Sequence, residues 1–424
     1  MDIPQGYKQT ELGIIPEDWE VKSFSQVFDM YPNNTYPRDC MNDSYGAIRN
    51  IHYGDILIKY PTIVDVERCS IPYLNEDVKI KAQKFVQSGD VIIADTAEDE
   101  TVGKCVEIKN AINAKIVSGL HTFFCHPIRI FAIGWWGYYL NSSNYHNQLL
   151  PYITGIKVSS ISRASIQETK LLVPPIAEQQ AIAEALSDID GLIATLDKKI
   201  AKKRLIKQGA MQQLLTGKKR LPGFSDPWVE KKFSDLYRYA SEGGTPDTNN
   251  MRFYANGDVP FVKIEDTETK YIESCNSFIT SEGINNSSAW IVPVNSIIYT
   301  NGATIGNVSI NKIPVATKQG ILGIIPSSII NLEFMYYLLL SQNFKREVDS
   351  RQAKGTFATI ILKSLDEIPI YLPLNQMEQI AIATILTDMD KEIADLEAQR
   401  DKYRLLKSGM MQKLLTGQIR LKIK

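Results

Sequence analysis

A stretch of 44 residues occurs twice in the chain. Residues 178–221 and residues 378–421 align with a constant offset of 200 and without a gap, and 24 of the 44 aligned pairs are identical. Both copies close with Met-Gln-x-Leu-Leu-Thr-Gly, at 211–217 and 411–417. A spacing of this length is too large for a stacked repeat array, so it predicts a duplicated domain plan.

Both copies have the periodicity of a helix. Asn375 and Glu378 fit a capping box, Pro174 and Pro175 mark the other helix start, and Gly217 and Gly417 sit where the helices should stop. This predicts helices of about 40 residues, roughly 60 Å long. A glycine also falls inside each helix, at 209 and 409, where we expect a frayed or kinked end rather than a close helix crossing. Apolar residues recur every three or four positions, as in a coiled coil, at 182, 186, 189, 193, 196 and 200, and at 382, 386, 389, 393 and 396.

The regions outside the repeats predict compact mixed α/β domains. A helix is expected at 332–350 and an amphipathic segment near 130–150. A short N-terminal leader segment that ends at Ser25 has a counterpart that ends at Ser234. The order of leader segment, variable region and helical repeat therefore occurs twice, which predicts a pseudo-two-fold arrangement. Short β-rich runs predict strands at 90–94, 122–125, 259–264, 296–300, 308–310 and 321–325. We therefore predict domains at 1–170 and 221–370 and helical segments at 171–220 and 371–424.

Composition excludes several classes of protein. The chain has no run of 18 uncharged apolar residues and no basic-then-apolar N-terminus, so we expect a cytoplasmic protein. Its five cysteines form no Cys-x-x-Cys pair and are expected to be free buried thiols. His121, Cys125 and His126 form a single His/Cys cluster, which lacks the further ligand that zinc requires, so we predict no metal site.

The usual catalytic motifs are also missing. No Gly-x-Gly-x-x-Gly loop, P-loop, His-Glu-x-x-His or Gly-x-Ser-x-Gly occurs, and no Asn-Pro-Pro-Tyr-type methyltransferase loop, which predicts a chain without its own catalytic site. The paired aspartates at 188 and 190, and at 388 and 390, are interpreted as parts of charge networks or of a surface for a partner. Nine Lys or Arg residues lie between 197 and 220; a solvated helix face is favoured, and phosphate contact stays open.

The duplicated helix and the β-rich regions together resemble the specificity subunit of a type I restriction-modification system. The motifs that carry the resemblance are Val-Pro-Pro-Ile-Ala-Glu-Gln-Gln-Ala-Ile-Ala at 173–183, its partner at 372–383 and both Leu-Leu-Thr-Gly endings. The second variable region adds Gly-Gly-Thr-Pro at 243–246 and Asn-Gly-Ala-Thr-Ile-Gly at 301–306. The first variable region lacks Gly-Gly-Thr-Pro and is interpreted as another subtype of recognition domain.

The resemblance implies an architecture and a set of partners. It implies a mixed α/β (α+β) fold, with two target recognition domains separated by two long antiparallel helices. The implied partners are double-stranded DNA with a bipartite gapped site, two modification (methyltransferase) subunits and restriction subunits. This chain would hold no cofactor of its own, because S-adenosylmethionine, and ATP with Mg²⁺ for restriction, would be bound by the partner subunits.

Polar residues of the variable regions are the candidate DNA contacts. Arg, Asn, Gln and Lys suit base edges, whereas Ser and Thr suit phosphates. Because the repeat recurs while the variable regions differ, we expect subunit docking at Glu178, Gln179, Glu378 and Gln379 instead. The candidates are Arg49, Asn50, His52, Thr96, Lys104, Ser118, His121 and Lys157 in the first region, and Thr245, Lys263, Asn301, Thr304, Lys318, Gln319, Lys354 and Thr356 in the second.

Two other interpretations of the duplicated plan stay open at this point. One is the specificity subunit of a related type II restriction-modification enzyme, which has the same layout and a fused nuclease-methylase partner. The other is a two-headed scaffold whose β-rich domains bind proteins. Gapped, salt-sensitive and sequence-specific DNA binding would exclude the scaffold.

Overall fold

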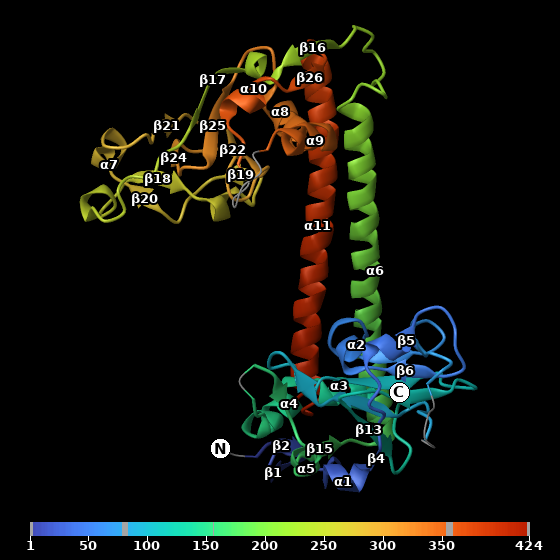
Figure 1. Cartoon of the computed structure of the whole chain (residues 1–424). Coiled ribbons are helices and arrows are strands. Elements are labelled where there is room, and N and C mark those ends of the chain that lie inside the picture. Colours follow the sequence, from blue (N-terminus) through green and yellow to red (C-terminus); the bar gives the residue numbers. More distant parts are fainter. Residues whose placement is uncertain (1–2, 79–83, 156, 353–358, 422–424) are drawn as a thin grey trace. The chain divides into compact units, whose positions relative to one another are not determined.

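The chain forms two compact units built from alternating segments (Figure 1). The computed structural model describes residues 3–78, 84–155, 157–352 and 359–421. Unit 1 consists of Met1–Asp197 and Ala398–Lys424, and unit 2 consists of Lys198–Glu397. Each unit therefore contains one variable region together with part of each long helix, and the predicted mixed α/β class with duplicated domains is confirmed.

The two repeats are continuous helices. α6 (Ile176–Leu214) and α11 (Gln376–Leu414) have 39 residues each. Both continue past the internal glycines, so the predicted fraying is wrong, and a Cβ built on Gly209 or Gly409 meets nothing within 4 Å, so no close crossing occurs there either. The capping box is only half present: Asn375 Oδ1 accepts from the Met377 N–H at 3.0 Å, but the Glu378 side chain binds elsewhere.

Within each unit, α6 and α11 run antiparallel and are joined by ion pairs between their side chains. In unit 1, Lys407 Nζ lies 2.7 Å from Asp190 and Arg400 lies 3.5 Å from Asp197, so residue numbers rise along one helix as they fall along the other. Lys207 and Asp390 repeat the first pair in unit 2. The network interpretation of Asp190 and Asp390 is confirmed.

The basic run is divided by this pairing. Lys198, Lys199, Lys202, Lys218 and Lys219 are exposed, as a solvated face requires. The other four members, Lys203, Arg204, Lys207 and Arg220, bind carboxylates of α11 instead.

Unit 1 contains a five-stranded sheet and a smaller four-stranded sheet. Short helices cover them. Of the amphipathic segment expected near 130–150, α4 (Ser143–Leu149) buries Tyr145 and Leu149 and exposes Asn147, whereas α3 (Trp135–Leu140) is buried on every side. The five-stranded sheet has the order β4 (Phe28–Tyr31), β13 (Thr122–Pro127), β9 (Val91–Ala94), β11 (Cys105–Lys109), β7 (Ile63–Asp65). The four-stranded sheet has the order β12 (Ile116–Ser118), β6 (Arg49–Ile51), β8 (Tyr73–Leu74), β5 (Met41–Asn42). Pairs of strands are formed by β1 (Tyr7–Thr10) with β2 (Gly13–Pro16), β3 (Glu20–Ser23) with β15 (Lys170–Val173), and β10 (Thr96–Ala97) with β14 (Ser159–Ser160). The helices are α1 (Phe24–Val27), α2 (Tyr53–Ile58), α3 (Trp135–Leu140), α4 (Ser143–Leu149) and α5 (Arg163–Gln167).

Unit 2 repeats the order of the five-stranded sheet, but the fourth strand of its smaller sheet lies on the opposite edge from that of unit 1. The predicted helix at 332–350 is wrong in one respect: it breaks at Ser341, whose hydroxyl accepts from the Phe344 N–H at 3.3 Å and starts a second helix. The five-stranded sheet has the order β17 (Tyr237–Glu242), β25 (Ile321–Pro326), β22 (Ile297–Thr300), β23 (Val308–Asn311), β19 (Tyr271–Ile272). The four-stranded sheet has the order β20 (Phe278–Ile279), β18 (Val259–Val262), β24 (Val315–Thr317), β21 (Ile291–Val292), and β16 (Val229–Lys232) pairs with β26 (Pro369–Leu372). The helices are α7 (Ser281–Asn285), α8 (Leu332–Leu339), α9 (Gln342–Arg351) and α10 (Leu362–Asp366).

The Leu-Leu-Thr-Gly endings anchor the helix ends in the two cores. Leu414 and Leu415 belong to the core of unit 1, and Leu214 and Leu215 belong to that of unit 2. The glycine that follows has φ of 71° at Gly417, a left-handed conformation that glycine adopts without strain. A side chain there would also collide with Pro16, since a Cβ would lie 2.5 Å from its ring.

The structure also bears on two expectations drawn from composition. Among the described residues, no helix is both long and apolar enough to cross a membrane. The five cysteines are free; Cys105, Cys125 and Cys275 are buried as expected, whereas Cys40 and Cys69 are half-buried.

Candidate nucleic-acid interface

In each unit, two neighbouring parallel strands end side by side. β6 and β12 are parallel in unit 1, as are β18 and β24 in unit 2. His52 follows β6 and is the N-cap of α2, whereas Lys263 follows β18 and is the N-cap of a 3₁₀ helix, Ile264–Thr267. His52 and Lys263 therefore occupy equivalent places on one scaffold.

The turns that follow the second strand of each pair are equivalent as well. His121 has φ of 54° in unit 1, and Gly320 has φ of 87° in unit 2. The Asp95 N–H donates to the His121 carbonyl at 3.1 Å, and the Asn301 N–H donates to the Gly320 carbonyl at 2.9 Å. A left-handed backbone is uncommon for a residue with a side chain, and such positions gather at functional sites.

In unit 1 the polar side chains at these strand ends contact one another. We call His52, Tyr53, Asp95, Thr96 and His121 the unit 1 strand-end cluster. The His52 and Tyr53 ring centroids are 4.6 Å apart, and those of Tyr53 and His121 are 5.3 Å apart. His121 Nδ1 lies 3.2 Å from an Asp95 carboxylate oxygen, which also accepts from the Thr96 hydroxyl at 2.7 Å.

The imidazole of His52 is held in a less polar setting. Its Nδ1 accepts the Gly54 N–H at 3.2 Å, and burial lowers the pKa of His52, an effect that nearby Asp55 opposes. The ring is therefore biased towards its neutral form near neutral pH. The His121 side chain, by contrast, is 48% exposed.

The unit 2 strand-end cluster consists of Thr245, Lys263, Lys318, Gln319 and Gly320. The Gln319 N–H donates to Thr245 Oγ1 at 3.5 Å, and the Lys318 N–H donates to the Val262 carbonyl at 3.0 Å, which holds the turn against β18. The side chains of Lys318 and Gln319 are exposed. This surface offers lysines and an amide where unit 1 offers two imidazoles.

Three predicted DNA contacts are buried and are corrected. Asn50 is 0% exposed and accepts from Asn34 at 2.6 Å, and the Ser118 hydroxyl pairs with Thr122 at 2.6 Å. Asn301 is 4% exposed and donates to the Ile360 carbonyl at 3.1 Å. Each lies in or directly beyond a strand, where its side chain hydrogen-bonds to groups of the interior instead of facing DNA.

Two further candidates are held inside unit 1 by their own bonds. Arg49 starts β6, at the end away from His52, and donates to the Val66 carbonyl at 3.2 Å. Lys104 donates to the Leu57 carbonyl at 2.7 Å, and burial lowers its pKa. Neither side chain belongs to the unit 1 strand-end cluster.

The remaining candidates and the missed residues complete the comparison. Lys157 and Thr304 are exposed on loops, and Lys354 and Thr356 lie outside the described residues. Tyr53 and Asp95 were not among the candidates; aligning the two variable regions strand by strand would have placed Asp95 opposite Asn301, directly after the central strand of the larger sheet.

The four predicted docking residues are not on the surface. Glu178, Gln179, Glu378 and Gln379 are at most 3% exposed. Glu178 accepts from Trp19 Nε1 at 2.9 Å and from Arg420 Nη2 at 2.6 Å, while Glu378 accepts from Trp228 and Arg220. These bonds join each helix start to the leader and to the end of the other helix, so direct docking is corrected to a role inside each unit.

The His/Cys cluster does not converge. Cys125 is buried in the core of unit 1, while His126 Nδ1 lies 2.6 Å from Asp90 and His121 contacts Asp95. The described part of the chain contains no group of three or more His, Cys, Asp or Glu residues placed to hold a metal ion.

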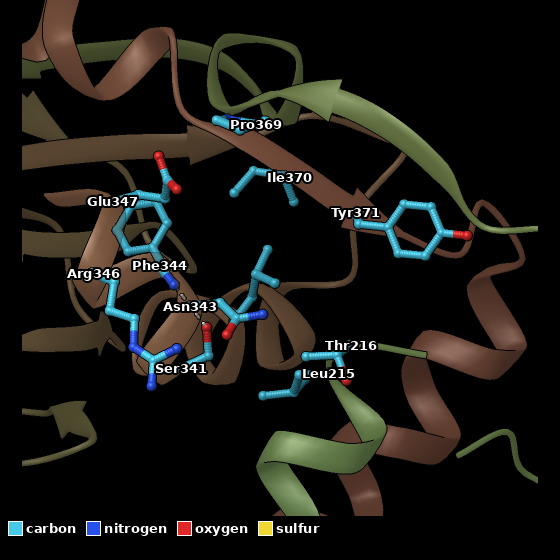
Figure 2. Close-up of a pocket in the computed structure, with 11 residues that line it drawn as sticks. Leu215, Thr216, Ser341, Asn343, Phe344, Arg346, Glu347, Pro369, Ile370 and Tyr371 are labelled. Carbon is cyan, nitrogen blue, oxygen red and sulfur yellow. Dashed lines mark hydrogen bonds between the residues drawn. The ribbon is translucent and has the colours of Figure 1, made fainter. Parts of the chain in front are cut away.

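A cleft of about 340 Å³ lies elsewhere in unit 2 (Figure 2). Figure 2 shows it between α9 residues such as Glu347 and the β26 residues Pro369–Tyr371. The same place in unit 1 is bridged, because the Gln148 amide donates to the Lys170 carbonyl and accepts its N–H, both at 3.0 Å. Pro369 has no N–H, and Glu347 pairs with Arg351, so unit 2 lacks this bridge. The cleft is lined by none of the strand-end residues.

Comparison with known proteins agrees with the duplicated plan. A family model described as the type I restriction modification DNA specificity domain matches residues 16–203 and 225–403, which is most of the chain. The chain belongs to this family. Each match contains one strand-end cluster, so the family's domain occurs here twice with different side chains on the same backbone.

Specificity subunits of both archaea and bacteria are similar to this chain. The one described for the MjaX type I restriction enzyme of Methanocaldococcus jannaschii is 25% identical over an alignment of 436 positions, gaps included, which covers 99% of this chain and 97% of that protein. The EcoR124I/EcoR124II specificity subunit of Escherichia coli is 29% identical over 152 residues, 35% of this chain and 37% of that one. The crystal structure of the type I S subunit from M. genitalium shares the fold, with a TM-score of 0.56, 13% identity and coverage of 98% of both chains.

Proposed function

We propose that this chain is the DNA-specificity subunit of a type I restriction-modification complex and recognises a bipartite, gapped site. The observation that carries the proposal is the double family match, with one strand-end cluster in each matched segment. The two clusters share their backbone but present imidazoles in one unit and lysines with an amide in the other. Two such surfaces suit two different half-sites, because base edges are distinguished by their donors and acceptors.

The chain itself is a non-catalytic recognition subunit. In this proposal two modification subunits bind S-adenosylmethionine and transfer its methyl group to adenine, and restriction subunits bring ATP and Mg²⁺. The exposed lysines of α6, including Lys198, Lys199 and Lys202, are available to contact phosphate, which would make binding weaken with salt.

Mapping adenine methylation across the host genome, with and without this chain, tests the proposal. We expect one gapped, asymmetric motif to lose its methylation when the chain is absent and to regain it on complementation. A complemented Lys318→Ala variant should alter one half-site only, whereas Lys345→Ala, on α9 outside the cluster, should alter neither. Methylation that is the same with and without the chain would refute the proposal.

A further inference from the structure

The two histidines of the unit 1 strand-end cluster have opposite hydrogen-bonding roles. His52 Nδ1 accepts the Gly54 N–H, so that nitrogen carries no proton and the proton of the neutral ring lies on Nε2. His52 therefore presents a donor at Nε2.

His121 is fixed in the other tautomer. Its Nδ1 faces the Asp95 carboxylate at 3.2 Å, and a carboxylate only accepts. The Thr96 hydroxyl, 3.4 Å from the same nitrogen, has its proton engaged with Asp95 at 2.7 Å and cannot donate to the ring. The proton of neutral His121 therefore lies on Nδ1, and Nε2 presents a lone pair.

Neither Nε2 atom has a hydrogen-bond partner within the ranges that the structure describes; His52 is half-buried, and the His121 side chain is 48% exposed. The two rings flank Tyr53, with centroid distances to it of 4.6 and 5.3 Å. The rotation of each ring is fixed by its own Nδ1 bond, so the donor and the acceptor are pre-positioned before binding.

Only one base offers the complement of this pair on its own major-groove edge. Adenine presents an acceptor at N7 and a donor at its N6 amino group, whereas guanine presents two acceptors, cytosine a donor alone, and thymine an acceptor beside a methyl group. A guanine O6 opposite the His121 lone pair would place two acceptors against each other.

We infer that His52 and His121 recognise an adenine of the half-site bound by unit 1, with His52 Nε2–H donating to N7 and His121 Nε2 accepting from the N6 amino group. The inference rests on the proposed DNA-recognition function and names the base and the atoms. Unit 2 has no such pair, because Lys263 and Gly320 occupy the equivalent places. We therefore expect no adenine to be required in this way in the half-site bound by unit 2.

Two substitutions remove one role each without removing the local fold. His52→Asn keeps an N-cap acceptor for Gly54 while losing the Nε2 donor. His121→Gly removes the acceptor at a left-handed position where unit 2 already has glycine, so we expect no loss of thermal stability. His126→Asn is the matched control, since His126 lies on the following strand and also pairs with an aspartate, Asp90, outside the cluster.

The test measures binding of the full chain, assembled with its modification subunits, to duplexes of the motif obtained by methylation mapping. Each adenine of the unit 1 half-site is replaced in turn by 7-deazaadenine, which lacks N7, or by purine, which lacks the N6 amino group. At one position we expect each replacement to weaken wild-type binding about 2-fold to 12-fold, the range of one net hydrogen bond. At that position, 7-deazaadenine should have no further effect on His52→Asn, and purine none on His121→Gly.

The outcomes separate this inference from the proposed function. Loss of discrimination at a single adenine in both variants, with His126→Asn unchanged, supports it. A gapped motif in which no adenine responds, or variants that weaken all sequences equally as phosphate contacts would, overturns the inference and leaves the proposed function standing. Absence of any gapped motif overturns the proposed function itself.

Discussion

Replacing Arg420 tests whether the repeat stabilises each unit or docks a partner. Glu178 is 0% exposed and is bound by Arg420 Nε at 2.9 Å, by Arg420 Nη2 at 2.6 Å and by Trp19 Nε1. Arg420→Met would leave this buried carboxylate with the indole N–H alone. Breaking a buried ion pair from one side costs about 3–5 kcal/mol.

The expected cost here lies below that range. The Arg420 side chain is 36% exposed and also binds Asp18, so water reaches the site, and the Trp19 bond to Glu178 survives. We expect about 2–3 kcal/mol, which lowers Tm by about 5–10 °C for a unit of roughly 200 residues. The measurement is thermal unfolding of the full chain by circular dichroism, with hydrogen exchange at the end of α11.

A control and an assembly assay complete this test. Arg404→Met, on α11, removes an exposed partner of Asp197 on α6 and should change stability by less than about 0.5 kcal/mol. Below the melting temperature, Arg420→Met should still assemble with modification subunits. If Tm stays within about a degree of wild type while assembly is lost, the stabilising role of the Arg420–Glu178 pair is refuted and the docking prediction is restored.

Three further outcomes follow from the structure. Gly209→Ala and Gly409→Ala should each stabilise the chain by about 1 kcal/mol in urea unfolding, because the helix is regular there and space is open, whereas Gly417→Ala should destabilise it. Burial raises the pKa of Glu107 from 4.5 to about 7, although its carboxylate accepts hydrogen bonds from the Gly134 and Gly137 N–H groups, which lower the pKa. The folded chain then binds more protons than the unfolded chain between these values, so stability should fall by about 3 kcal/mol as pH rises from 4.5 to 7, and Glu107→Gln should remove that slope. Inserting four residues into both α6 and α11, about 6 Å of helix, should change the gap of the methylated motif by roughly two base pairs and leave both half-sites intact, as genome methylation mapping would show.

The helices and most strands could be predicted because their signals are local. A seam at three- and four-residue spacing, with a glycine beyond it, defines α6 and α11 to within a few residues. The burial of Asn50 and Ser118 could not be predicted, since a polar residue in a short strand faces either side with the same sequence pattern. Arg220 and Glu378 pair although 158 positions separate them in the sequence. A count of basic residues along the chain therefore could not show that Arg220 is paired with a buried carboxylate.

The same limit explains why the most recurrent residues were mistaken for a docking surface. Recurrence shows that Glu178 and Glu378 have the same task in both units, and burial shows that the task is to join the leader, the helix start and the end of the other helix. Specificity needs the opposite property, a backbone that recurs while its side chains differ. His121 and Gly320 meet that condition, because one left-handed turn carries an imidazole in unit 1 and no side chain in unit 2. At positions where the backbone is the same in both units but the side chain differs, a substitution can therefore change the target sequence with the least loss of fold stability.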